Sequence, residues 1–173
     1  MADTAAIPVL FSAEEIALRV KTLAREIAAL PKKPDIAMPS LVGGFVFAAE
    51  LVRALALEGV SLDIEMLWLR SYGDKRVASA VSMIAGPSEQ IAGRHVLVID
   101  GVLDAGRTIK KAVSLIEAAG AASVRVVVAL DKQRPDAVAQ ADHVGFVIGN
   151  EFVIGYGMDD AGHYRSLPYI GKV

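Results

Sequence analysis

The chain has 173 residues, 54% of them hydrophobic and 22% charged, which predicts one folded globular domain and excludes an intrinsically disordered protein. Its net charge of −2 argues against a nucleic-acid partner, because nucleic-acid surfaces require clustered lysine and arginine. The lack of cysteine excludes disulfides, and the lack of a signal peptide or a membrane-length apolar run predicts a cytoplasmic protein with no membrane partner.

The first half of the chain is predicted to alternate between helices and strands. A helix begins at Ser12, because Ser12 and Glu15 have capping-box spacing and hydrophobic residues follow at helical intervals. A strand is predicted over Ile36–Val42, and Pro39 within it indicates an irregular or edge position. The next helix is predicted over Phe45–Leu57.

The middle of the chain is predicted to contain extended segments and then a buried strand. Asp63–Leu69 is strand-like, Arg70–Lys75 is a polar loop, and Val77–Ile84 is a further extended segment. Val96–Ile99 is apolar at every position, as expected for a strand covered on both faces. A helix is predicted over Gly106–Ala119.

The last third is predicted to hold more strands. Val124–Leu130 is a second doubly buried strand, and shorter strands follow at Val144–Ile148 and Phe152–Ile154, before a tail rich in loops. Strands that alternate with helices predict an α/β fold with a parallel sheet. Such sheets bind ligands beyond the carboxyl ends of their strands.

The segment after Val96–Ile99 is the strongest candidate site. Asp100 is expected at the strand end and Asp104 in the loop, while Gly106 and Thr108 open the next helix. A helix N-terminus binds phosphate through free N–H groups, and glycine allows the backbone to approach the anion. The carboxylates would serve ribose hydroxyls, Mg²⁺ or a proton instead.

Two other interpretations of this segment stay open. Asp104 could simply cap the helix, with Gly106 permitting the turn. Alternatively, Gly101–Thr108 has the spacing of a nucleotide-binding P-loop, although Arg107 stands in place of its lysine, and Asp131 would end the metal-binding strand.

The segment HVLVIDGVLDAGRT resembles the phosphoribosyl pyrophosphate signature of type I phosphoribosyltransferases. The segments SAEEIALRVKTLAREI, LVGGFVFAAELVRAL, LRSYGD and NEFVIGYGMDDAGHYRSLPYIG extend the resemblance to the hypoxanthine-guanine phosphoribosyltransferase family over nearly the whole chain. The resemblance implies the type I phosphoribosyltransferase fold, in which a parallel-sheet core is flanked by helices. The core would cover about residues 35–148, and the N-terminal segment and about residues 149–173 would form a small hood.

The resemblance also implies a reaction and its residues. Hypoxanthine or guanine would displace pyrophosphate from phosphoribosyl pyrophosphate to give the nucleoside monophosphate, with Mg²⁺ as cofactor and a homodimer or homotetramer as the assembly. Asp104 would be the general base near purine N7. The other implied roles are 5′-phosphate binding by Ala105, Gly106, Arg107 and Thr108; ribose binding by Asp100; pyrophosphate binding by Gly43 and Arg165; purine binding by Lys132, Phe152 and Val153; a lid containing Ser71 and Tyr72; and Mg²⁺ binding by Asp159.

Several of these residues also have structural interpretations. Lys132 could be a solvated strand-end lysine, Phe152 a core residue and Tyr72 an exposed loop aromatic. Asp159 could belong to a turn, and Arg165 could form a surface ion pair of little energy.

The chain also departs from the family pattern. Gly101 replaces the second of two adjacent acids, Ala105 replaces a threonine, and Val42 replaces a common lysine. Two functions therefore remain open. One is an active purine salvage transferase; the other is a catalytically weakened protein that binds phosphoribosyl ligands for regulation or assembly.

Overall fold

The computed structural model describes residues 7–72 and 80–173, and within strands it gives only the backbone of residues 70–72 and 80–82.

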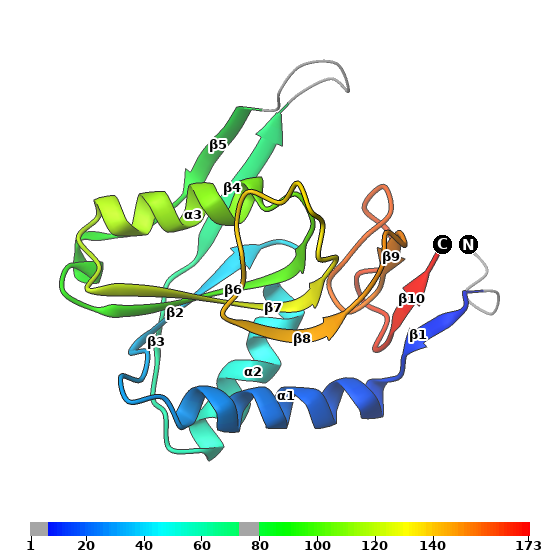
Figure 1. The fold of residues 1–173 in the computed structure, drawn as a ribbon, viewed down its shortest axis with the longest axis horizontal. Helices are drawn as coiled ribbons and strands as arrows, with labels where there is room; N and C mark the ends of the chain where they lie inside the picture. Colours follow the sequence, from blue (N-terminus) through cyan, green and yellow to red (C-terminus); the bar gives the residue numbers. More distant parts are fainter. Residues whose placement is uncertain (1–6, 73–79) are drawn as a thin grey trace.

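Its larger sheet has the strand order β5-β4-β2-β6-β7-β8, and β3 pairs with β2 beside this path (Figure 1). The pairings of β2 with β3, β4 and β6, of β6 with β7, and of β7 with β8 are parallel. Only β5, at the sheet edge, is antiparallel among these described strands. The strands are β2 (Ile36–Leu41), β3 (Asp63–Ile64), β4 (Leu67–Tyr72), β5 (Ala80–Ala85), β6 (His95–Leu103), β7 (Ser123–Asp131) and β8 (His143–Val147).

Helices cover both faces of this sheet. Helices α1 (Ala13–Ala28) and α2 (Phe45–Leu57) lie on one face, and α3 (Arg107–Ala118) lies on the other (Figure 1). The residues of β6 divide between the two faces: Leu97 and Ile99 pack with α1 and α2, whereas Val96 and Val98 pack with α3. This division explains the continuous apolar run, and it confirms the predicted α/β fold with a mostly parallel sheet.

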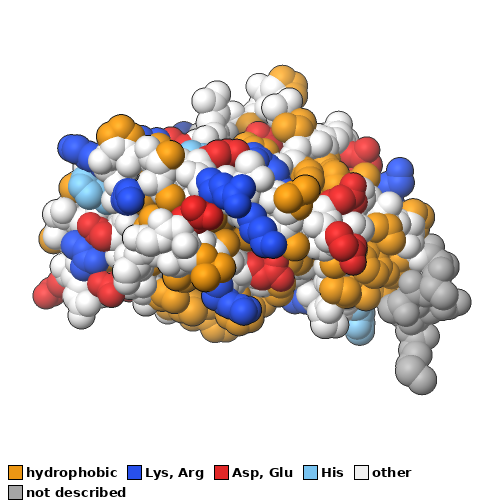
Figure 2. Space-filling view, turned by 90° about the horizontal axis from the view of Figure 1, so that it is seen from below, with side chains coloured by type: hydrophobic (Ala, Val, Ile, Leu, Met, Phe, Trp, Pro, Cys, Tyr) orange, Lys and Arg blue, Asp and Glu red, His pale blue; other side chains and the backbone are white. Residues whose placement is uncertain are grey.

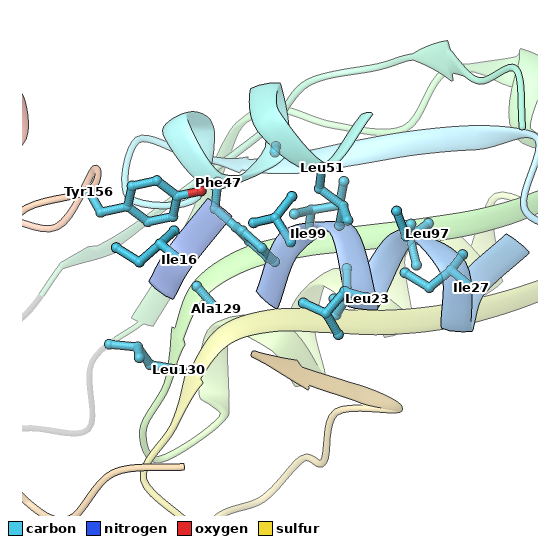
Figure 3. Close-up of a cluster of buried hydrophobic side chains, with 14 of the residues drawn as sticks. Ile16, Leu23, Ile27, Phe47, Leu51, Leu97, Ile99, Ala129, Leu130 and Tyr156 are labelled. Carbon is cyan, nitrogen blue, oxygen red and sulfur yellow. The ribbon is translucent and has the colours of Figure 1, made fainter. Parts of the chain in front are cut away.

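The core beneath α1 joins elements from the whole chain. Figure 3 shows Ile16, Leu23 and Ile27 of α1 packed against Phe47 and Leu51 of α2 and against side chains of β6 and β7. Leu23 and Ile27 are completely buried. The spacing of these residues on α1 is the helical spacing that the sequence predicted.

The predicted start of α1 is confirmed. The Ser12 backbone N–H donates to Glu15 Oε2 at 2.8 Å, and the Glu15 N–H donates to Ser12 Oγ at 3.2 Å. This capping box satisfies two backbone donors that the first turn of a helix otherwise leaves unpaired.

The predicted irregular position of Pro39 is confirmed, whereas the alternative of an edge position is wrong, because β2 lies between β4 and β6. Ala37 pairs with β3 and Ser40 pairs with β4, so Pro39 faces the interruption between these two strands. Residues two apart direct their backbone groups to the same neighbour, and the Ala37 carbonyl accepts from Glu65 on this side. The missing N–H of proline therefore falls where the ladder is already broken.

Three boundaries also differ from the predictions. The segment Asp63–Leu69 is divided into β3 and the start of β4, and Arg70–Tyr72 continues β4 instead of forming a loop. Residues 73–79, which include the rest of that predicted loop, lie outside the described residues. β6 runs on to Leu103, so Asp100 lies within the strand and not at its end.

The two ends of the chain form a second, three-stranded sheet. β10 (Ile170–Lys172) lies in its centre and pairs with β1 (Val9–Phe11) and β9 (Val153–Ile154). Figure 1 shows this sheet beside the carboxyl ends of the larger sheet. The strands β1 and β10 were not predicted, and the division into core and hood stays a prediction.

The described helices are all too short or too polar to cross a lipid bilayer. Figure 2 shows basic and acidic side chains interspersed among hydrophobic ones on the face seen from below.

Candidate active site

A cleft of about 280 Å³ opens where the carboxyl ends of the parallel strands meet the small sheet. A second cavity of about 350 Å³ adjoins it, and Asp100, Val102 and Asp104 line both. The first cavity is also lined by Gly43, Gly101, Lys132, Phe152, Val153, Met158, Asp159 and Arg165. The second is also lined by Ala105, Gly106, Arg107, Thr108, Ile109, Arg134 and Asp136. The cleft therefore brings together all the predicted site residues except Ser71 and Tyr72.

The phosphate-loop candidate lies at the N-terminus of α3. Gly106 is the N-cap residue, with φ +74° and no side-chain cap, so the first N–H groups of α3 are free of a capping side chain. A Cβ atom on Gly106 would lie 2.9 Å from the Ala139 backbone nitrogen, so both conformation and space favour glycine. Ala105 accepts from the Val138 N–H at 3.0 Å, which holds the turn in place.

Two alternative interpretations of this segment are wrong. A P-loop would need Gly101–Asp104 to curl around phosphate, but Gly101, Val102 and Leu103 belong to strand β6. Asp104 does not cap α3, because Gly106 occupies that position and Asp104 makes ion pairs instead.

Asp104 is paired with two cations. Lys132 Nζ lies 3.3 Å from Asp104 Oδ2, and Arg134 Nη1 lies 3.0 Å from Asp104 Oδ1. β6 and β7 are neighbours, and the Lys132 N–H donates to the Leu103 carbonyl at 3.0 Å, which fixes the two strand ends together. The side chain of Lys132 is only 12% exposed, so the interpretation of a freely solvated lysine is wrong.

Asp100 lies in the floor shared by the two cavities. Burial raises the pKa of its carboxyl group to about 6, although hydrogen bonds from the Gly101 N–H and the Ser40 side chain favour the charged form. The Gly101 N–H donates to Asp100 Oδ1 at 2.7 Å. These two donors therefore compensate the carboxylate only in part, and it has capacity for further donors.

The turn at Gly43 is packed tightly between two other glycines. A Cβ atom on Gly101 would lie 3.0 Å from the Gly43 carbonyl oxygen, and one on Gly157 would lie 2.5 Å from the same oxygen. Gly157 also has φ +96°, which side chains rarely tolerate. The absence of an acid at position 101 therefore coincides with a close approach of the Gly43 turn.

The opposite wall of the cleft comes from the chain after β8. Phe152 is 51% exposed, so it is not a core residue, whereas Val153 is buried. Arg165 Nη2 lies 2.7 Å from Asp159 Oδ1, and Arg165 Nη1 donates to the Gly157 carbonyl at 2.7 Å. Asp159 lies just before the turn at Ala161 and Gly162, and its Oδ2 accepts from the Gly162 N–H, yet it also lines the cleft.

The lid residues are not placed in the cleft. Ser71 and Tyr72 are the last residues of β4, and their backbones pair with Val81 and Ala80 of β5. Their side chains lie outside the described part of the structure. Their role as a lid stays a prediction.

Three residues of the site were not predicted. Arg134 lines the second cavity and contacts Asp104, Ser40 bonds to Asp100, and Met158 lines the first cavity. The position of Arg134 two residues after Lys132 was the one available signal for it. Nothing local to Ser40 or Met158 indicates that the fold brings them to the site.

Comparison with known proteins finds relatives with a common activity. The family model for a phosphoribosyl transferase domain matches residues 10–161. The hypoxanthine-guanine phosphoribosyltransferase of Bacillus subtilis is 36% identical over 166 residues, which cover 94% of this chain and 91% of the relative. The bifunctional protein TilS/HprT of Listeria innocua is 38% identical over 94% of this chain, but the chain spans only 25% of that longer protein.

A solved structure has the same architecture. The hypoxanthine phosphoribosyltransferase of Trypanosoma cruzi, in complex with its product IMP, superimposes with a TM-score of 0.85 at 34% identity. The match covers 95% of this chain and 92% of the other.

Proposed function

The chain belongs to the hypoxanthine-guanine phosphoribosyltransferase family, and we propose that it transfers a phosphoribosyl group from phosphoribosyl pyrophosphate to a 6-oxopurine. The observation that carries this proposal is one cleft in which Asp104 and Lys132 lie between a phosphate cavity and the exposed ring of Phe152. The products would be a nucleoside monophosphate, of the kind bound by the Trypanosoma cruzi relative, and pyrophosphate.

The sugar phosphate is proposed to bind across the shared floor of the two cavities. The N–H groups at the start of α3, together with the Thr108 hydroxyl, would donate to the 5′-phosphate. Asp100 would accept from the ribose hydroxyls, which supply the donors that its buried carboxylate lacks. The Gly43 turn and Arg165 would bind the pyrophosphate on the other side.

The purine is proposed to stack on Phe152, with the Val153 backbone at its edge. Lys132 would donate to the 6-oxygen, because its ammonium group already lies in the cleft. Asp104 would accept the proton from N7 as the bond to the sugar forms. Its 3.3 Å contact with Lys132 keeps acceptor and donor next to each other, which matches the 6-oxygen and N7, two neighbouring atoms on the same edge of the purine.

The described residues fit a magnesium ion that arrives with the substrate. They contain no group of three potential ligands that would form a cage made of protein alone. Mg²⁺ commonly uses one or two carboxylates together with substrate phosphates and water, and Asp159 lies at the pyrophosphate side of the cleft. When bound, Mg²⁺ would neutralise the leaving pyrophosphate.

We further propose a homo-oligomer, a homodimer or homotetramer, of cytoplasmic location. Four hydrophobic side chains near the start of α2 and the β3–β4 connection are 42–52% exposed, namely Val42, Phe45, Ile64 and Met66. Such a group on one surface suits an interface between copies. Sedimentation of wild type and of Phe45→Glu would test this, since the variant should shift towards monomer; an unshifted variant would place the interface elsewhere.

The absence of the second acid favours one competing function, that of a protein that binds the nucleotide but does not transfer the phosphoribosyl group. The test incubates purified protein with Mg²⁺, phosphoribosyl pyrophosphate and one of three bases: hypoxanthine, guanine or xanthine. Nucleotide formation is followed by chromatography. Nucleotide should form with hypoxanthine or guanine. Binding of IMP without turnover on any base would support the binding function and overturn the transferase.

A further inference from the structure

Arg134 is held between two carboxylates at the edge of the phosphate cavity. Its Nη1 donates to Asp104 Oδ1 at 3.0 Å, while its Nε and Nη2 donate to the two oxygens of Asp136, each at 2.9 Å. Arginine has five N–H groups, so two remain without a partner among the described residues. The carboxylates of Asp136 and Asp104 raise the pKa of Arg134, and it stays charged throughout the pH range of interest.

This arrangement competes with the proposed role of Asp104. Both carboxylate oxygens of Asp104 face a cation, Lys132 on one side and Arg134 on the other. Each oxygen keeps a second acceptor position, but a purine N7–H that approaches Oδ1 has to compete with the guanidinium of Arg134. Arg134 is the more exposed of the two cations, at 37% against 12% for Lys132, and is therefore the one that can move with less loss of packing.

We propose that Arg134 is a second phosphate-binding residue that changes partner on substrate binding, an inference that rests on the proposed function. In the structure it contacts Asp104. With a phosphorylated sugar bound, its guanidinium donates to the 5′-phosphate held at the start of α3, and Asp104 Oδ1 becomes free.

Three observations support this exchange. Arg134 lines the same cavity as Gly106, Arg107 and Thr108. A phosphate dianion offers more charge and more acceptor oxygens than one carboxylate, so it competes well for a guanidinium. Asp136 holds the other edge of the same guanidinium through two hydrogen bonds, which keeps Arg134 at the cavity while its Nη1 exchanges one acceptor for another.

The exchange would link the two substrates. Arrival of the sugar phosphate would release the carboxylate that accepts the purine proton. A nucleoside, which has no 5′-phosphate, would leave Arg134 on Asp104.

The test compares IMP with inosine by calorimetry on wild type, Arg134→Gln and a control, Arg125→Gln. Arg125 is also a partly exposed arginine paired with an aspartate, Asp142, but lies at the start of β7 away from the cleft. Loss of one charge-assisted hydrogen bond corresponds to about tenfold or more in affinity. Arg134→Gln should weaken IMP at least about tenfold while inosine changes by less than about threefold, and the control should change neither.

Two further measurements keep the outcome decisive. Arg134→Lys retains the charge if the Gln variant does not fold, and it should give an intermediate loss for IMP. The ³¹P resonance of bound IMP should titrate at higher pH in Arg134→Gln than in wild type, because a cation beside a phosphate favours its dianion. Equal losses for IMP and inosine, with an unchanged ³¹P titration, would overturn the exchange. Wild type that binds neither phosphoribosyl pyrophosphate nor IMP would instead overturn the proposed function.

Discussion

Replacement of Asp100 by asparagine should stabilise the protein at neutral pH even though it damages the proposed ribose site. Burial raises the pKa of this carboxyl group to about 6, against an ordinary value of 3.8. Each pKa unit corresponds to about 1.4 kcal/mol, so the charged carboxylate costs the fold at most about 3 kcal/mol above pH 6. Asp100 lines the cleft, and access of water there lowers this cost to about 1–2 kcal/mol. An amide keeps the hydrogen bond from the Gly101 N–H without the charge.

The stability difference between wild type and Asp100→Asn should change with pH in a defined direction. A raised pKa in the folded state means that the folded protein holds its proton longer, so this group's contribution to stability falls as pH rises from about 4 to about 6. Urea unfolding of wild type and Asp100→Asn at several values between pH 4 and 8 should give curves that nearly meet at pH 4 and separate above pH 6. A gap that does not change with pH, or a variant less stable at pH 7, would refute the role of buried charge.

The remaining predictions concern catalysis, recognition and packing. Asp104→Asn should lower turnover by about 10²-fold or more while IMP affinity changes little, and unchanged turnover in a steady-state assay would remove it from the role of base. Phe152→Ala should raise the KM for the purine by up to about tenfold, with the KM for phosphoribosyl pyrophosphate as the internal control. Gly101→Ala should weaken pyrophosphate-side binding, because its Cβ would lie 3.0 Å from the Gly43 carbonyl; equal pyrophosphate inhibition of both proteins would contradict this. Leu23→Ala should lower the free energy of unfolding by about 2–5 kcal/mol in denaturant titration without changing KM, and a loss below about 1 kcal/mol would mean that the core collapses around the gap.

The sequence allowed the core of the fold and most of the cleft to be predicted. The apolar run Val96–Ile99 predicted a strand buried on both faces, and the pair Ser12 and Glu15 predicted the start of a helix. Both predictions were possible because each pattern lies within a short stretch of sequence. The lining residues followed from the family resemblance together with the rule that ligands bind at the carboxyl ends of parallel strands. Their roles in binding and catalysis stay predictions.

The errors arose where contacts between distant parts of the chain determine the local structure. The missing N–H of Pro39 predicted an irregular or edge position, and the edge alternative is wrong because the interruption between β3 and β4 accommodates proline inside the sheet. The extension of β6 beyond Asp100 depends on pairing with β7, which no pattern within the loop reveals. Arg134 was left unassigned since only the folded chain shows its distance from Asp104.

The position of β10 between β1 and β9 sets an order on folding. Val9–Phe11 is among the first described segments of the chain, yet its strand partner is Ile170–Lys172, so no neighbour within the first half of the chain can complete it. β9 directly follows Phe152 of the cleft wall, and it also pairs with β10, near the end of the chain. Contacts between residues so far apart in sequence form slowly, because a long loop must close first. A chain under synthesis can therefore assemble the phosphate loop well before it can finish the wall on which the purine is proposed to stack.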